Sequence, residues 1–230
     1  MNSKSKIIVA LDSNNFTKIK NLLKKISNDI YGVKVGYQFF YNFNQKGYNL
    51  LKENKLKIFL DLKLHDIPNT VSMGIKALLK YKPDMLTVHI SGGEEMIKAA
   101  KKVTKNIKLI GISALTSLNK KDINQIYNRK DINKFIISMT KIALKANADG
   151  IVCSPKEIKI VKKISKNKLI IITPGIRFLN KKIKNDDQKR SLNPKDAIKL
   201  GANYLVIGRP ILNAKNPLEL ICQINDQTRW

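Results

Sequence analysis

Short apolar runs of β character alternate with segments of helical periodicity along most of the chain. The first run covers residues 7–12, and apolar residues recur at helical spacing over 16–27. The pattern predicts further strands over 32–37, 58–64, 85–90, 109–115, 151–153, 169–173 and 204–207. It predicts a helix that ends near 53 and others over 70–81, 94–104, 133–145, 155–164, 197–200 and 218–224. The chain therefore contains eight strand–helix units.

Eight such units in 230 residues predict an α/β fold, the (β/α)8 or TIM barrel, formed as a single domain by residues 1–230. The alternative is an open, doubly wound parallel sheet. No G-x-G-x-x-G follows the first strand, which makes a dinucleotide-binding sheet the weaker of the two interpretations.

Polar residues collect where the predicted strands end, as the active sites of such barrels do. Asp12 ends the first strand, Lys34 lies in the second, and Thr116 follows the fifth. The loops after the seventh and eighth strands are frequent phosphate sites in barrels. Here they read P-G-I-R over 174–177 and G-R-P over 208–210, so Arg209 beside a glycine suits a phosphate dianion.

Residues 57–71 place three charges in and just beyond an apolar strand. Asp61 and Lys63 project to the same side because side chains alternate along a strand, and Asp66 follows after the strand has ended. An isolated Asp-x-Lys is most often a structural ion pair. Removing three charges from water is costly unless they are well paired, so this cluster favours a chemical role.

Composition limits the other functional classes. The net charge of +27, from 44 basic and 17 acidic residues, would suit a nucleic-acid-binding protein, but the lysines are dispersed through every predicted helix. No apolar segment approaches the length of a membrane span, and Cys153 and Cys222 lack the spacing of a zinc site or a disulfide framework. We expect a soluble cytoplasmic protein that binds no specific nucleic acid and no membrane.

The stretch D-L-K-L-H-D-I-P-N-T-V over 61–71 resembles the D-x-K-x-x-D-I-P-N-T signature of the orotidine 5′-phosphate decarboxylase family. Further segments are similar to that family along nearly the whole chain. They read V-A-L-D over 9–12, V-K-V-G over 33–36, L-T-V-H over 86–89, A-L-T-S over 114–117, T-P-G-I-R over 173–177 and I-G-R-P-I over 207–211.

The resemblance implies decarboxylation of orotidine 5′-monophosphate to uridine 5′-monophosphate and CO2, the last step of de novo UMP synthesis, without a metal or organic cofactor. It implies that Lys63 donates a proton to C6 of the pyrimidine and that Asp61 lies beside the leaving carboxylate. Lys34 and Asp66 would complete an alternating array of charges.

The same resemblance assigns the substrate contacts. Asp12 and Lys34 would hold ribose hydroxyls, and Thr116 would contact the pyrimidine. The phosphate would be bound by the following residues: Arg177, Gln188, Gly208 and Arg209. Gln188 lies in a lysine-rich segment, 178–193, that we expect to close over the phosphate, and Arg190 or a nearby lysine is an alternative to it.

The family resemblance also implies a homodimer in which Asp66 and Thr70 reach the neighbouring subunit's site. Three alternatives stay open at this point. A magnesium-dependent sugar-phosphate enzyme similar to hexulose-6-phosphate synthase shares D-x-K-x-x-D. A basic nucleic-acid-binding protein would explain the net charge but would leave the cluster at 61–66 without a purpose. An inactive barrel is disfavoured by the intact set of charged residues.

Overall fold

Eight parallel strands close into a barrel in a computed structural model that describes residues 5–177 and 192–228. Each strand pairs with the next in the chain, and β1 closes the ring against β8. The strands are β1 (Ile7–Ala10), β2 (Gly32–Val35), β3 (Lys57–Leu64), β4 (Met85–His89), β5 (Lys108–Ile112), β6 (Gly150–Val152), β7 (Ile170–Thr173) and β8 (Tyr204–Ile207). The (β/α)8 prediction is confirmed, and the open sheet is wrong.

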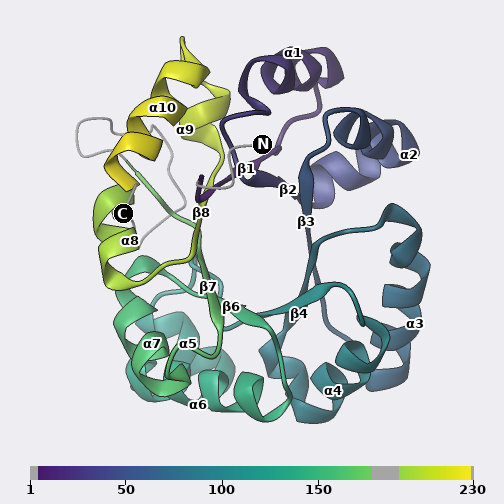
Figure 1. Ribbon diagram of the computed structural model, residues 1–230. Coiled ribbons are helices and arrows are strands. Elements are labelled where there is room, and N and C mark those ends of the chain that lie inside the picture. The colour runs from purple at the N-terminus through teal and green to yellow at the C-terminus, as the bar shows by residue number, and fades with distance from the viewer. Residues whose placement is uncertain (1–4, 178–191, 229–230) are drawn as a thin grey trace.

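Helices surround the barrel on its outer side (Figure 1). The α-helices are α1 (Phe16–Ile26), α2 (Tyr37–Glu53), α3 (Pro68–Leu78), α4 (Gly93–Val103), α5 (Lys120–Tyr127), α6 (Ile132–Lys145), α7 (Ile158–Ser165), α8 (Pro194–Leu200), α9 (Arg209–Leu212) and α10 (Pro217–Thr228). Three short 3₁₀ helices are η1 (Leu79–Tyr81), η2 (Ile90–Gly92) and η3 (Pro155–Glu157). None of the described helices is long and apolar enough to cross a membrane.

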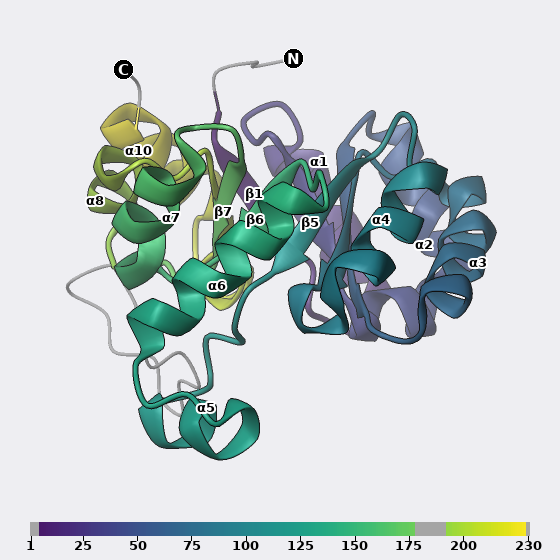
Figure 2. The ribbon, with the colours of Figure 1, turned by 90° about the horizontal axis from the view of Figure 1, so that it is seen from below.

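Local sequence accounts for most of these boundaries. In α1 the residues at helical spacing are the buried ones, and the Asn15 side chain caps the first turn by accepting a hydrogen bond from the Lys18 N–H. The segment between β5 and α6 forms the additional helix α5, which opens with a capping box between Asn119 and Asp122. This helix projects from the barrel on the side away from α10 (Figure 2).

Apolar side chains form two separate cores. The larger core fills the space between the strands and the surrounding helices. The smaller one fills the barrel interior with Ile8, Ala10, Phe59, Met85, Ile110, Ile172 and Val206. Two residues beyond Phe59 and Met85, on the same face of their strands, come Asp61 and Thr87. The barrel interior therefore changes from apolar to polar toward the C-terminal ends of the strands.

Candidate active site

A cavity of about 290 Å³ opens at the C-terminal ends of the strands. Its size is near the lower end of the range for small-molecule sites. Eight of the predicted site residues line it: Asp12, Lys34, Asp61, Lys63, Thr116, Arg177, Gly208 and Arg209. The loops after β1, β5, β7 and β8 thus bring residues from distant parts of the sequence together with β2 and β3.

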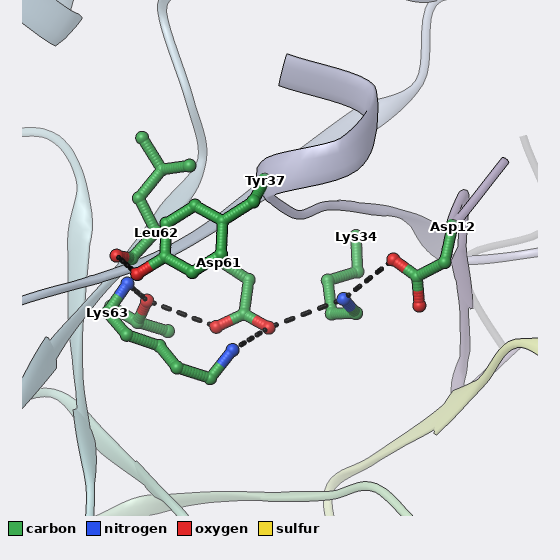
Figure 3. Close-up of polar contacts among 7 residues, drawn as sticks. Asp12, Lys34, Tyr37, Asp61, Leu62 and Lys63 are labelled. Atoms are coloured by element: carbon green, nitrogen blue, oxygen red, sulfur yellow. Dashed lines mark hydrogen bonds and ion pairs between the residues drawn. The ribbon is translucent and has the colours of Figure 1, made fainter. Parts of the chain in front are cut away.

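Four charged side chains form an alternating row across this cavity (Figure 3). Lys34 Nζ lies 3.2 Å from Asp12 Oδ1 and 3.4 Å from Asp61 Oδ2. Lys63 Nζ lies 2.8 Å from the same Asp61 Oδ2. One carboxylate oxygen therefore accepts from two ammonium groups, and Lys63 stands at the end of the row.

Charge pairing outweighs burial at the centre of the row. Burial by itself would raise the pKa of Asp61, but Lys34 and Lys63 lower it below its ordinary value. Burial would likewise lower the pKa of Lys34, and the carboxylates of Asp61 and Asp12 raise it instead. Lys34 and Asp61 are consequently ionised at neutral pH, which fixes opposite charges at the centre of the row.

The backbone of β3 is irregular where it carries these charges. The pairing of β3 with β4 shifts register between Leu60 and Leu64, and Lys63 has a φ of +48°, which is uncommon for a residue with a side chain. Thr87 on β4 accepts a hydrogen bond from the Lys63 N–H at 2.8 Å and donates one to Asp61 Oδ1 at 3.1 Å. Sequence reasoning did not select Thr87.

Tyr37 is a second residue that the sequence analysis did not select. Its hydroxyl donates to the carbonyl of Leu62 at 2.8 Å, so the first turn of α2 is tied to the irregular part of β3 (Figure 3). The two histidines of the chain lie beside the same segment, with ring centroids of His65 and His89 5.2 Å apart. Burial, followed by the nearby His65 and Lys63, lowers the pKa of His89, which favours its neutral form.

The wall of the cavity also carries two arginines, Arg177 and Arg209. Gly175 lies between β7 and Arg177 with a φ of +74°, a left-handed conformation that glycine adopts without steric cost. A Cβ at Gly208 would lie 3.3 Å from the Cβ of Ala10, so a side chain there would crowd the first strand. The wall therefore offers backbone and guanidinium donors suited to a phosphate.

Two predicted residues lie outside this cavity. Asp66 and Thr70 are exposed at the start of α3, and the Asp66 carboxylate accepts from the N–H of Ile67 at 2.7 Å. Among the described residues, Asp66 forms no ion pair with Lys63. Of the two predicted carboxylates, Asp61 is therefore the one that pairs with Lys63 within the described part of this chain.

The predicted loop over 178–193 is described only at its end. Residues 178–191, with Gln188 and Arg190, lie outside the described residues. Leu192 pairs with Ile176, and its carbonyl accepts from the Arg177 N–H at 2.9 Å. Asn193 caps α8 by accepting from the Asp196 N–H. Within the described ranges there is no group of three or more His, Cys, Asp or Glu side chains placed to hold a metal ion.

Comparison with known proteins assigns the family. The profile described as "Orotidine 5′-phosphate decarboxylase / HUMPS family" matches residues 5–224. The chain belongs to this family. A relative named orotidine 5′-phosphate decarboxylase from Wigglesworthia glossinidia brevipalpis is 46% identical over 224 residues, which is 96% of each chain. The protein of that name from Carboxydothermus hydrogenoformans is 38% identical over 92% of this chain and 90% of its own.

Solved structures agree with the sequence relatives. The crystal structure of orotidine 5′-phosphate decarboxylase from Lactobacillus acidophilus superposes with a TM-score of 0.82 at 34% identity, covering 98% of this chain and 100% of that one. The family description is a joint one, so membership alone does not choose between activities. The individual curated relatives, 37–46% identical to this chain, carry the decarboxylase name.

Proposed function

We propose that this protein decarboxylates orotidine 5′-monophosphate to uridine 5′-monophosphate and CO2, the last step of de novo UMP synthesis. The observation that carries the proposal is the row Asp12–Lys34–Asp61–Lys63, centred on the buried Asp61, in a cavity that two arginines also line. Such a site suits a ligand with a phosphate at one end and a reacting carboxylate at the other. The named relatives agree with this substrate.

The reaction breaks the bond between C6 of the pyrimidine and its carboxylate carbon. The electron pair of that bond remains on C6 as CO2 leaves, and no adjacent carbonyl delocalises it. The Lys63 ammonium attracts the developing charge and then transfers a proton to C6, which leaves a neutral amine that solvent reprotonates. Because Lys63 supplies both the charge and the proton, we infer that no metal or organic cofactor takes part.

The family resemblance suggests the remaining contacts, and their residues in the described ranges line the cavity. Asp61, held between two lysines, would face the leaving carboxylate, and repulsion between them would make the smaller contribution. Asp12 and Lys34 would bind ribose hydroxyls, and Thr116 would contact the pyrimidine. Arg177, Gly208 and Arg209 would bind the phosphate together with Gln188, and closure of 178–193 would use phosphate binding to favour the transition state.

We also propose a homodimer in which Asp66 and Thr70 complete the partner's site. Four of the eight large exposed apolar side chains in the described structure belong to α2 or α3 or directly precede α3, namely Tyr37, Tyr41, Ile67 and Met73, which are between 51% and 71% exposed. The helices that carry or follow them, α2 and α3, lie on the same side of the barrel in both views (Figures 1 and 2). A second copy would cover this apolar face.

Mixing two inactive variants tests this arrangement. Lys63→Ala and Asp66→Ala each disable both sites of their own dimers. If Asp66 acts across the interface, a hybrid dimer contains one intact site, so an equal mixture after subunit exchange should recover about a quarter of wild-type activity. No recovery, with exchange confirmed by native mass spectrometry, would place Asp66 in its own subunit's site.

The activity itself is tested by following the pyrimidine ultraviolet absorbance as the purified protein consumes orotidine 5′-monophosphate in excess chelator. We expect turnover, whereas a sugar-phosphate enzyme of this family would be silent and would need magnesium. A nucleic-acid-binding protein would instead show strongly salt-dependent binding and no turnover. A cytoplasmic location is the natural one for nucleotide synthesis, and cell fractionation tests it.

A further inference from the structure

The register of β3 against β4 sets Thr87 opposite both active-site charges. Leu60 pairs with Leu86 and Leu64 pairs with Val88, so four steps along β3 match two along β4. Residues 61–63 are therefore all set against Thr87, and β3 carries a bulge there. Bulges redirect side chains, and this one carries Asp61 and Lys63 toward the cavity.

The Thr87 hydroxyl replaces the hydrogen bonding that the bulge disrupts. It accepts from the Lys63 N–H at 2.8 Å, so its single proton is directed to Asp61 Oδ1, 3.1 Å away. Asp61 Oδ2 is then left to face the ammonium groups of Lys34 and Lys63, 3.4 and 2.8 Å away. The hydroxyl thus holds a left-handed backbone conformation at Lys63 and the orientation of the Asp61 carboxylate.

We propose that Thr87 is a positioning residue of the active site, acting through Asp61 and Lys63. The Thr87 side chain has no exposed surface, so it does not contact a ligand in the cavity. Without the hydroxyl, Asp61 Oδ1 would lose the hydrogen bond that orients it, and the Lys63 N–H would lose its acceptor. This inference rests on the proposed decarboxylation and adds a residue to its machinery.

The test compares Thr87→Val, which keeps the shape and removes the hydroxyl, with Thr87→Ser, which keeps the hydroxyl. We expect Thr87→Val to lower kcat about 10- to 100-fold, with KM changed less than about threefold, because a hydrogen bond to a charged group is lost without loss of a phosphate contact. Thr87→Ser should stay within about threefold of wild type. Rates are normalised to folded protein, measured by circular dichroism.

Thr140→Val is the matched control. Thr140 is also fully buried and donates its hydroxyl proton to the Ile136 carbonyl at 2.7 Å, but it lies in α6 away from the cavity. Loss of the Thr140 hydroxyl should lower the stability of the protein and leave kcat unchanged. If Thr87→Val does not fold, the pair Thr87→Ala and Thr87→Ser, which differ only by the hydroxyl, decides the question. Equal kcat with and without the hydroxyl overturns the proposal.

A second readout separates this proposal from the proposed activity. Carboxyl NMR of the substrate-free protein should show Asp61 titrating at higher pH in Thr87→Val but not in Thr87→Ser, because the hydroxyl stabilises the carboxylate. The other groups that act on Asp61 are Lys34 of β2, Lys63 of β3, Tyr37 of α2 and His89 of β4, all unchanged in these variants. An inactive wild type would contradict the decarboxylation, whereas an unshifted Asp61 titration would overturn the role of Thr87.

Discussion

The two ends of the barrel both carry lysine–aspartate pairs, yet they use them differently. At the N-terminal end, Asp84 accepts from the Ile58 N–H and from Lys57 Nζ, at 2.8 and 2.7 Å. Asp149 likewise binds the Leu109 N–H and Lys101. At the C-terminal end, Asp61 accepts from two lysines and from Thr87.

The two ends differ in how exposed the aspartates are and in how many lysines pair with each one. The side chains of Asp84 and Asp149 are 30% and 31% exposed and each has one lysine, whereas that of Asp61 is 9% exposed and has two. Asp84 and Asp149 join a strand to its neighbour and neutralise a lysine near solvent. Asp61 concentrates fixed charge beside a cavity. A lysine–aspartate pair therefore indicates chemistry only where the aspartate is buried and pairs with more than one lysine.

The largest stability effect is expected at Asp61. Replacing it by Asn leaves Lys63 without its carboxylate partner and Lys34 with Asp12 alone, so the free energy of unfolding at pH 7 should fall by about 3 kcal/mol. The pKa of Asp61 is below its ordinary value of 3.8, so its stabilising contribution is complete above that pH. The difference between wild type and Asp61→Asn should shrink as the pH falls further and Asp61 of the wild type is protonated.

Denaturant titrations at several pH values measure this difference. Asp12→Asn is a useful comparison because Asp12 contacts one lysine only and lies at a more exposed position, 47% against 9%. Asp12→Asn should lower the free energy of unfolding by less than Asp61→Asn does at every pH. A stability difference between wild type and Asp61→Asn that does not change with pH would contradict an ionised Asp61 in the folded protein.

At the proposed phosphate site, Arg209→Ala should lower kcat/KM about 10- to 100-fold, mainly through KM, because a hydrogen bond between charged groups would be lost. Arg129→Ala is the control, since Arg129 is exposed and does not line the cavity. Steady-state kinetics with orotidine 5′-monophosphate measures both. An Arg209→Ala enzyme with wild-type constants would place the phosphate elsewhere.

The smallest effect is expected at the N-terminal end. Asp84→Ala removes the acceptor of the Ile58 N–H and of Lys57, which should lower the free energy of unfolding by about 1–2 kcal/mol. The kcat of the folded protein should not change, because Asp84 lies at the end of the barrel away from the cavity. Thermal unfolding and initial rates measure the two quantities separately. A large fall in kcat in Asp84→Ala would contradict a purely structural role for the lysine–aspartate pairs at the N-terminal end.

Much of the fold could be predicted from local patterns. Periodicities of two and of about 3.6 predicted the eight units. The period of two also predicted that Asp61 and Lys63 share one side of β3, and both line the cavity, but they do so through a register shift and a left-handed conformation at Lys63. Strand ends were less predictable. The first strand was predicted over 7–12, but β1 ends at Ala10 and leaves Asp12 in the loop, where it pairs with Lys34.

The residues that were missed depend on distant parts of the chain. Thr87 reads as an ordinary β-forming residue in a buried strand, and its contacts arise only from the register shift between β3 and β4. Tyr37 was read as the end of a strand, but it begins α2, and its hydroxyl reaches Leu62. Neither contact is encoded in local periodicity, because each requires two elements to be placed relative to one another.

The most direct test compares two lysines of the same strand. Lys63 and Lys57 both lie in β3 and both bind an aspartate, at 2.8 and 2.7 Å, but at opposite ends of the barrel. With orotidine 5′-monophosphate as substrate, we expect Lys63→Ala to lower kcat about 10⁴-fold or more, since it loses the proton donor and the stabilising charge together. Lys57→Ala should keep kcat within about twofold of wild type. Comparable losses in the two variants, or substantial activity in Lys63→Ala, would contradict the account.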